Sequence, residues 1–477
     1  MNILFVASEC APFIKTGGLA DVIGAVPKAL KPLGANVRIL LPAYSALAGE
    51  VAKGTEVMTL PDLHGGPARV VAVSARGLDL LLLDAPHLFD RTGNIYLGPD
   101  GNDWHDNALR FGTLSQVGAQ IAMGALRDWT PDLVNAHDWQ AALVPAYLKA
   151  AGSTVPTVMT IHNIAFQGLF DPGILGPLSL PGDMYSVDRG EYYGHFSFLK
   201  TGLMLANKIT TVSPTYAREL LTPEFGMGLD GVMQARRTDL TGIVNGIDLD
   251  IWNPETDPAI PAPYSAKTLK RKAQNKAALE ARFGITPGDG PLFCVISRLT
   301  TQKGLDLLLE MMPAFVERGA RLALLGSGAR EMEQAYADAS RRYAGRVGVI
   351  IGYDENLSHL MQAGADAILI PSRFEPCGLT QLYGLRYGTI PVVALTGGLA
   401  DTVINASPAA LARKVATGIQ FAPVTAGALR NALVRLGTLY KDRETWSRLQ
   451  TNAMAQPVCW ALSAKAYAEL YAGLTTS

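Results

Sequence analysis

The sequence predicts an α/β protein with two doubly wound domains, each built on a parallel sheet covered by helices. Three observations predict it. Short apolar runs rich in β-branched residues alternate with longer helical patterns over nearly all 477 residues. These runs are continuously apolar, which is typical of strands buried on both faces. A proline-rich stretch near the middle interrupts the series, and the chain is longer than one hydrophobic core usually supports.

The predicted strands form one series in each half of the chain. In the first half they are Ile3–Ala7, Val37–Leu41, Leu80–Leu83, Leu133–Ala136, Thr157–Ile161 and Lys208–Val212. In the second half they are Leu292–Ile296, Leu322–Leu325, Val347–Ile351, Ala367–Ile370, Ile390–Ala394 and Gly418–Phe421. Such strands separated by helices form parallel sheets, so each half is expected to be a Rossmann-like domain.

The domain boundary is predicted at the proline-rich stretch, which no helix or central strand tolerates. Its turn residues and prolines include Asn253-Pro254, Asp257-Pro258, Pro261 and Pro263. Before the proline-rich stretch, residues 243–246 predict a strand that ends in a turn. We therefore expect an N-terminal domain at 1–245, a linker at 246–262, a C-terminal domain at 263–456 and a last helix at 457–477. The amphipathic part of this last helix, Trp460–Tyr471, is compatible with packing on either domain.

Composition excludes several classes of protein. With 41 basic and 42 acidic residues and no basic cluster, the chain is not expected to bind nucleic acid, whereas a neutral polymer such as a glucan stays compatible. The cysteines are scattered without CxxC spacing, which predicts reduced thiols rather than disulfides or a zinc site. The N-terminus lacks a basic segment, and no apolar run is long enough to span a bilayer. We expect a soluble, cytoplasmic protein.

Polar residues of the first half follow predicted strands, where open parallel sheets bind their ligands. Lys15-Thr16-Gly17-Gly18 offers a cation, a backbone that a ligand can approach and the start of a helix. A plain helix-entry turn with a solvated lysine explains this loop equally well. His137-Asp138-Trp139 and Ile161-His162-Asn163 end two strands and suit sugar hydroxyls. A lone histidine is more often a buried structural residue, but two such clusters favour a site.

Two loops of the second half carry stronger signals. Arg298 and Lys303 flank a loop that enters a helix at Gly304, and two cations beside a helix N-terminus suit a diphosphate. In Ser372-Arg373-Phe374-Glu375-Pro376-Cys377-Gly378-Leu379-Thr380, a carboxylate precedes a possible helix start. This arrangement combines an acceptor for hydroxyl groups with a site for an anion. The alternatives are a solvated helix start and a surface turn.

One hexapeptide occurs twice. Thr16-Gly17-Gly18-Leu19-Ala20-Asp21 recurs as residues 396–401, and each copy follows a predicted strand and opens a helix. Both copies are compatible with presenting backbone N–H groups to a ligand from opposite sides of a cleft. Coincidence or shared helix-entry chemistry explains the repeat equally well.

Taken together, these motifs resemble those of the bacterial glycogen synthases, the ADP-glucose-using family related to plant starch synthases. The resemblance covers essentially the whole chain and implies the GT-B fold, in which two Rossmann-like domains face each other across a cleft. It implies a retaining hexosyltransferase that moves glucose from ADP-glucose to the non-reducing end of an α-1,4-glucan. The implied partners are ADP-glucose and glycogen or malto-oligosaccharide, with no cofactor and no metal. The last helix is implied to cross back onto the N-terminal domain.

The resemblance also implies roles for individual residues. Those implied for catalysis are His162, beside the anomeric carbon, Arg298 and Lys303, on the diphosphate, and Glu375, on glucose hydroxyls. Those implied for donor binding are Lys15, Gly17, Gly18, Tyr353 (stacked on adenine), Cys377, Gly378, Leu379 and Thr380. Asp138 and Asn163 are implied near the acceptor. Many related enzymes carry a second glutamate eight positions after the first, where this chain has Tyr383.

Three alternatives remain. A metal-dependent transferase would use a DxD pair, which Asp248-Leu249-Asp250 matches, but aspartates in such a segment more often cap turns. An α-glucan phosphorylase shares the fold but uses pyridoxal phosphate and a far longer chain. A non-catalytic glucan- or nucleotide-sugar-binding protein on the same scaffold would be expected to lose Lys15, Arg298, Lys303 or Glu375, and all four are present.

Overall fold

A computed structural model describes residues 1–475, and the chain forms two compact units. Unit 1 consists of Met1–Asn245 and the residues from Trp460 on, and unit 2 consists of Gly246–Cys459. The stretch predicted as a linker, 246–262, therefore belongs to unit 2. Its Ile247, Trp252 and Ile260 side chains lie in the hydrophobic core of that unit. The prolines end regular structure there without separating the stretch from the domain.

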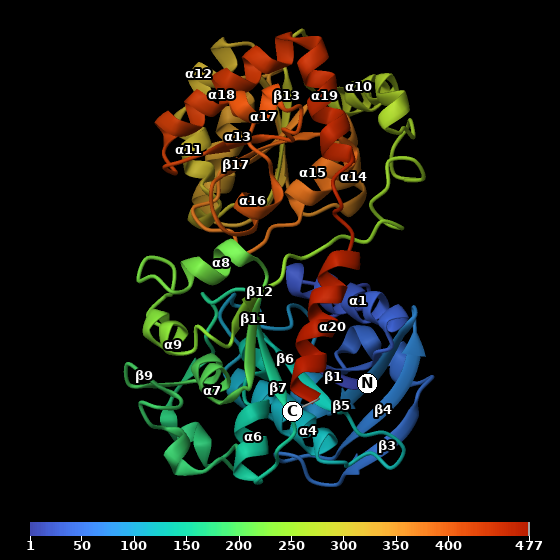
Figure 1. The fold of residues 1–477 in the computed structure, drawn as a ribbon, viewed down its shortest axis with the longest axis vertical. Coiled ribbons are helices and arrows are strands. Elements are labelled where there is room, and N and C mark those ends of the chain that lie inside the picture. The colour runs from blue at the N-terminus through green and yellow to red at the C-terminus, as the bar shows by residue number, and fades with distance from the viewer. Residues whose placement is uncertain (476–477) are drawn as a thin grey trace. The chain divides into compact units, whose positions relative to one another are not determined.

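Unit 1 contains a nine-stranded sheet in the order β12-β11-β7-β6-β1-β2-β5-β4-β3. Its strands are β1 (Asn2–Val6), β2 (Asn36–Pro42), β3 (Thr55–Leu60), β4 (Ala68–Ala75), β5 (Leu78–Asp84), β6 (Leu133–His137), β7 (Thr157–Ile161), β11 (Lys208–Thr211) and β12 (Leu240–Gly242). The strands from β12 to β5 pair in parallel, whereas β4 and β3 are antiparallel. Figure 1 shows β3 and β4 at the outer edge of this sheet.

Helices cover the sheet of unit 1. They are α1 (Gly18–Leu30), α2 (Ala48–Val51), α3 (Pro86–Phe89), α4 (Asn107–Ala122), α5 (Asp138–Ala141), α6 (Val144–Ala150), α7 (Phe198–Leu205), α8 (Pro214–Glu219), α9 (Asp230–Ala235) and α20 (Ala461–Thr475). A small antiparallel sheet joins β8 (Leu169–Phe170), β10 (His195–Ser197) and β9 (Glu191–Tyr192). The last helix, α20, lies beside α1 (Figure 1). Asn135 of β6 donates a hydrogen bond to Tyr471 Oη at 2.7 Å, which ties α20 to the sheet.

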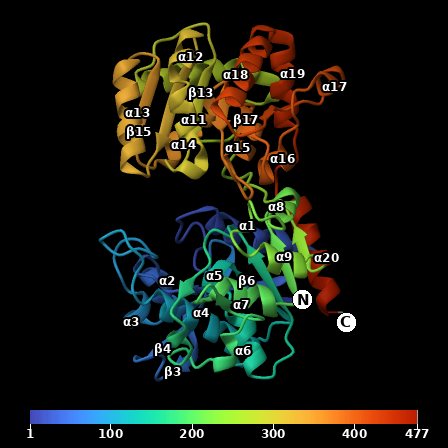
Figure 2. The ribbon, with the colours of Figure 1, turned by 90° about the vertical axis from the view of Figure 1, so that its left-hand side faces the viewer.

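Unit 2 contains a six-stranded sheet, entirely parallel, in the order β15-β14-β13-β16-β17-β18. Its strands are β13 (Leu292–Ile296), β14 (Arg321–Gly326), β15 (Val347–Ile351), β16 (Ala367–Ile370), β17 (Ile390–Ala394) and β18 (Ile419–Phe421). Its helices are α10 (Lys272–Phe283), α11 (Leu305–Glu310), α12 (Met312–Glu317), α13 (Arg330–Arg342), α14 (Glu355–Gly364), α15 (Thr380–Tyr387), α16 (Gly397–Thr402), α17 (Pro408–Ala412), α18 (Ala426–Lys441) and α19 (Arg443–Met454). Figure 2 shows α13 beside the edge strand β15.

The predicted α/β class and its two parallel sheets are confirmed. Each strand of the two predicted series is present within one or two residues of its expected ends. The sequence interpretation missed the hairpin of β3 and β4, whose strands are not continuously apolar: β3 consists of exposed and half-buried residues, and β4 mixes them with buried ones. The strand expected at 243–246 ends earlier, at Gly242. In the described part of the chain, no helix is long and apolar enough to cross a membrane.

Candidate active site

Each sheet has a point where successive connections run in opposite directions, and ligands of doubly wound sheets bind there beyond the strand ends. In unit 1 this point lies between β1 and β6, and in unit 2 between β13 and β16. The predicted site residues lie on the loops that follow these strands, with two exceptions. His162 and Asn163 follow β7, next to β6, and Tyr353 follows the edge strand β15.

In unit 2, the loops after β13 and β16 pack directly against each other. Gly304 has a positive φ of 64°, and a Cβ there would lie 2.0 Å from the carbonyl oxygen of Pro371. Only glycine permits this approach. The Arg373 guanidinium adds a bidentate pair with Asp306, at 2.7 Å for each bond. The two loops therefore present their side chains at one place.

This packing brings together two predicted catalytic residues. Lys303 Nζ lies 2.6 Å from Glu375 Oε2, and both side chains are largely shielded from solvent. Ser372 Oγ donates a second hydrogen bond to the same carboxylate oxygen at 2.8 Å. A carboxylate held by a cation and a hydroxyl has a fixed orientation and keeps acceptor capacity for a ligand hydroxyl. Ser372 was not singled out from the sequence, although it lies three residues before Glu375.

The N-terminus of α15 begins five residues after Glu375. Gly378 has a φ of 74°, Cys377 is buried, and Leu379 occupies the N-cap position. Among the residues that the structure describes, no side chain caps this N-terminus with a hydrogen bond. Backbone N–H groups at an uncapped helix start, favoured further by the helix dipole, bind anions. The start of α15 can therefore accept a phosphate close to Lys303 and Glu375.

Arg298, predicted for catalysis, and Tyr353, predicted for donor binding, are both exposed. The Arg298 side chain follows β13 and reaches solvent, with no ion pair among residues 1–475. The Tyr353 side chain is 69% exposed, and its hydroxyl donates to Glu355 at 2.7 Å. Tyr353 precedes α14, and an exposed aromatic residue is of the kind that stacks on a planar group such as a nucleobase.

In unit 1, the ends of β6 and β7 form a compact polar cluster. Asp138 has a φ of 55°, a left-handed conformation that is uncommon for residues other than glycine, although aspartate adopts it more readily than most. Its carboxylate accepts the backbone N–H of His162 at 2.7 Å and that of Asn163 at 3.4 Å. His137 Nδ1 lies 3.1 Å from His162 Nε2. Backbone strain of this kind occurs most often at functional sites.

Burial sets the charge of this cluster. It raises the pKa of Asp138 to about 7, although the two backbone N–H groups act in the opposite direction. Burial also lowers the pKa of the His162 and His137 imidazoles, so both rings are neutral at neutral pH. A cluster of neutral imidazoles and a carboxyl near its titration point suits hydrogen bonding to uncharged hydroxyl groups better than binding of an anion.

The loop around Lys15 is organised by a residue that the sequence interpretation missed. The buried Glu9 carboxylate accepts the backbone N–H groups of Thr16 and Gly17, as well as the Thr16 hydroxyl at 2.6 Å. Lys15 Nζ pairs with Asp21 at 2.8 Å, and Gly18 begins α1. Glu9 was detectable because it lies three residues after β1, at the same sheet edge as the other polar clusters.

The structure also bears on the metal-dependent alternative. Across residues 1–475, no group of three or more His, Cys, Asp or Glu side chains is arranged to hold a metal ion. In the Asp248-Leu249-Asp250 segment, Asp248 Oδ1 accepts the backbone N–H of Asp250 at 2.9 Å. This is the turn-capping role that aspartates commonly have in such segments.

Comparison with known proteins gives consistent matches. Residues 2–235 match the starch synthase catalytic domain, and residues 279–453 match the glycosyl transferases group 1. The chain is 63% identical over 473 residues to a glycogen synthase of Roseobacter denitrificans, covering 99% of each protein. It is 55% identical over 476 residues to glycogen synthase 1 of Rhizobium meliloti, with 99% of each covered. The catalytic domain of starch synthase IV from Arabidopsis thaliana, solved bound to ADP and acarbose, superposes with a TM-score of 0.88 at 31% identity, covering 100% of this chain and 99% of that one.

Proposed function

The chain belongs to the glycogen synthase family, and on that premise we propose that it transfers glucose from ADP-glucose to the non-reducing end of an α-1,4-glucan with retention of configuration. One observation of the geometry carries this proposal. In unit 2, a lysine, a carboxylate and an uncapped helix N-terminus converge at the point where the strand order reverses. A sugar joined to a diphosphate needs all three kinds of group.

The residues of unit 2 are assigned to the donor. Negative charge builds on the diphosphate as the glycosidic bond breaks, and Lys303 and Arg298 stabilise it there. Gly378, Leu379 and Thr380, after the buried Cys377, offer backbone N–H groups to the distal phosphate. Glu375, held by Lys303 and Ser372, accepts hydrogen bonds from glucose hydroxyls.

Tyr353, an exposed aromatic residue, is assigned to stacking on the adenine ring. The choice of ADP over UDP is supported by the starch synthase IV structure, which holds ADP. That structure also contains acarbose, which supports glycogen or a malto-oligosaccharide as the acceptor.

The residues of unit 1 are assigned to both substrates. Lys15, Gly17 and Gly18 contact the glucose or phosphate of the donor through the ammonium and the exposed backbone. The neutral imidazole of His162 lies beside the anomeric carbon, and Asp138 and Asn163 bind acceptor hydroxyls. The neutral imidazoles of this cluster, beside a carboxyl near its titration point, support its assignment to sugar rather than phosphate.

No cofactor or metal takes part in the proposed reaction, because Arg298 and Lys303 supply the positive charge that a cation would otherwise provide. We also propose a front-face mechanism, in which the departing phosphate helps to deprotonate the acceptor hydroxyl. The free thiols of Cys10, Cys294, Cys377 and Cys459 support a reaction in the cytoplasm.

A direct assay separates this proposal from the non-catalytic alternative. The protein is incubated with glycogen and either ADP-glucose or UDP-glucose, and release of nucleoside diphosphate is measured with and without EDTA. We expect release from ADP-glucose, with little change in EDTA. Binding of glycogen or ADP without release would support a binding protein. Activity that EDTA abolishes and magnesium restores would point instead to Asp248 and Asp250.

A further inference from the structure

Residues 252–264, which we call the strap, cross unit 2 beside α14 and α15. The sequence predicts a linker here, yet Trp252, Asp257 and Tyr264 are all buried. The Tyr264 hydroxyl donates to the carbonyl oxygen of Tyr387, the last residue of α15, at 2.6 Å. The strap is therefore fixed to the domain by side chains as well as by its backbone.

The Trp252 indole lies between one ring from each helix. It stacks on the His359 imidazole of α14 with centroids 3.8 Å apart and planes inclined by 10°. On its other face it stacks on the Tyr383 ring of α15 at 3.7 Å and 15°. A planar side chain held on both faces sets the separation between the elements that carry the flanking rings. Trp252 therefore sets the spacing of α14 and α15 at this level.

Asp257 connects the same two helices through hydrogen bonds. Its carboxylate Oδ2 lies 2.7 Å from His359 Nδ1 and accepts the Tyr387 hydroxyl at 2.5 Å. Burial alone would raise the pKa of Asp257, but the hydrogen bonds from His359 and Tyr387 outweigh it and hold this pKa below its usual range. An ionised carboxylate buried between two donors is costly to leave with only one of them.

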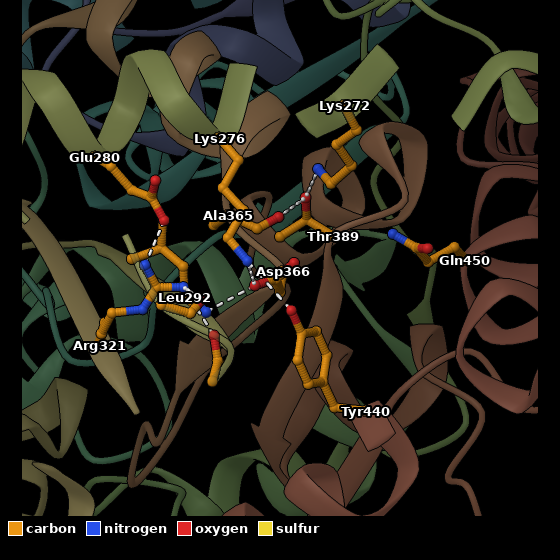
Figure 3. Close-up of polar contacts among 12 residues, drawn as sticks. Lys272, Lys276, Glu280, Leu292, Arg321, Ala365, Asp366, Thr389, Tyr440 and Gln450 are labelled. Atoms are coloured by element: carbon orange, nitrogen blue, oxygen red, sulfur yellow. Dashed lines mark hydrogen bonds and ion pairs between the residues drawn. The ribbon is translucent and has the colours of Figure 1, made fainter. Parts of the chain in front are cut away.

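The opposite ends of the two helices share the amine of one buried lysine, Lys272, whose pKa burial lowers to about 7. Lys272 Nζ donates to the carbonyl oxygen of Ala363, in the last turn of α14, at 2.8 Å and approaches that of Tyr387 at 3.4 Å. Figure 3 shows the Lys272 side chain directed at Thr389, whose hydroxyl lies 2.6 Å away. Lysine side chains near helix C-termini satisfy the last carbonyl groups. The C-terminal ends of α14 and α15 are thus fixed to one point.

The N-terminal ends of α14 and α15 carry the residues assigned to the donor. Tyr353 lies two residues before α14, and Thr380 is the first residue of α15. His359 and Tyr383 are only about one helical turn further along their helices, a rise of about 5 Å. A change in the spacing at Trp252 therefore moves the adenine position relative to the phosphate position.

We propose that Trp252 and Asp257 are positioning residues for the nucleotide-sugar donor. They contact neither the donor nor the reacting atoms. They hold the helix that follows the adenine-stacking residue at a fixed distance from the helix that binds the phosphate. The proposal rests on the proposed function, because it presupposes that unit 2 binds ADP-glucose.

The test measures ADP affinity by calorimetry together with donor and acceptor KM. Trp252→Leu removes the ring stack, and Tyr387→Phe removes one hydroxyl donor to Asp257 while keeping the ring. The matched control is Trp446→Leu, a tryptophan of α19 that is equally buried and packs on Tyr440 of α18. We expect Trp252→Leu to weaken ADP binding about 10-fold and Tyr387→Phe a few-fold, with acceptor KM unchanged, in the range seen for residues that act without touching the ligand. Trp252→Phe should restore most of the affinity.

The control decides between positioning and general stability. The proposal is overturned if Trp446→Leu weakens ADP binding as much as Trp252→Leu does at similar loss of Tm. It is also overturned if ADP affinity is unchanged in Tyr387→Phe and in folded Trp252→Leu. If Trp252→Leu does not fold, Tyr387→Phe decides alone. A wild-type protein that binds no ADP would instead contradict the proposed function, and the positioning role with it.

Discussion

The two copies of Thr-Gly-Gly-Leu-Ala-Asp have identical sequences and different surroundings. In the first copy, the Glu9 carboxylate accepts the backbone N–H groups of Thr16 and Gly17, and no atom lies within 4 Å of where a Gly17 Cβ would be. The Glu9 side chain therefore fixes the backbone of this loop, and the space beside the Gly17 α-carbon is open. Such a loop can approach a ligand with its backbone.

In the second copy, both glycines are buried against the loop that carries Glu375. A Cβ on Gly397 would lie 1.9 Å from the carbonyl oxygen of Glu375, and Gly397 has a φ of 43°. The Gly398 N–H lies 3.2 Å from that same oxygen. The main chain of Glu375 is thereby fixed, and its carboxylate stays available to Lys303 and Ser372.

The difference teaches that a glycine pair at a helix start serves two purposes. In one copy it leaves space for a ligand, and in the other it removes side chains so that a neighbouring loop can pack. Of the two explanations that the sequence left open for the repeat, presentation of backbone N–H groups to a ligand therefore stays a proposal only for the first copy. The second copy packs against the loop of a predicted catalytic residue, Glu375, and supports that loop.

The largest expected effect comes from Gly397→Ala. A methyl group at this positive φ meets a carbonyl oxygen, so the Glu375 loop must move or the domain must lose stability. We expect kcat/KM to fall by roughly 100-fold or more, the scale for removal of a charge-stabilising group, together with a clear drop in Tm. Gly427→Ala is the control, because no atom lies within 4 Å of where a Cβ on that glycine of α18 would be. Near-normal activity in Gly397→Ala would show that the second copy does not support the site.

Substitutions of Glu375 and of the two cations on the neighbouring loop after β13 sharpen the comparison. Lys303→Ala and Arg298→Ala should each lower kcat/KM roughly 100-fold, because the charge they stabilise develops in the transition state. Glu375→Gln should keep partial activity if Glu375 positions hydroxyl groups, whereas Glu375→Ala should keep almost none. Steady-state kinetics of the four variants are compared. Wild-type rates in both cation variants would contradict the site assignment, and a trapped glucosyl adduct on Glu375 would contradict a positioning role.

How far the sequence predicts this molecule depends on which interactions are local. Buried parallel strands such as β13 and β16 are predicted correctly because their apolar runs are continuous. The strap was predicted as a linker because its prolines indicate only an irregular backbone, while its burial depends on rings from α14 and α15. Glu9 and Ser372 lie close to a strand end and a motif in the sequence, but the contacts that give them their roles form only in the fold. Motifs predict a site at the strand ends. They do not show which residues form hydrogen bonds with one another there.

A smaller effect is expected from Glu9→Gln. The amide keeps one acceptor but adds a donor where Thr16, Gly17 and Tyr96 already donate. Leaving such donors unsatisfied costs about 1–3 kcal/mol. We expect the loop around Lys15 to loosen and donor KM to rise about 10-fold, the equivalent of about 1.4 kcal/mol. Thr16→Val, which removes only the hydroxyl, should have a weaker effect in the same direction. Unchanged kinetics in Glu9→Gln at normal Tm would show that the first copy does not depend on this carboxylate.

The smallest expected change in stability is that of Gly17→Ala, which separates the two copies most directly. Gly17 is extended, with a φ of −156°, so alanine adopts its backbone conformation without strain, and its methyl group points into open space. Because alanine also restricts the unfolded chain, we expect the free energy of unfolding to stay within about 1 kcal/mol of wild type or to rise slightly. If the donor approaches this backbone, the same methyl group blocks it and donor KM rises several-fold while Tm does not fall. Differential scanning calorimetry and donor titrations on one preparation measure both. A loss of stability comparable with that of Gly397→Ala would make the first copy a packing element like the second, and unchanged stability with unchanged KM would remove Gly17 from the donor site.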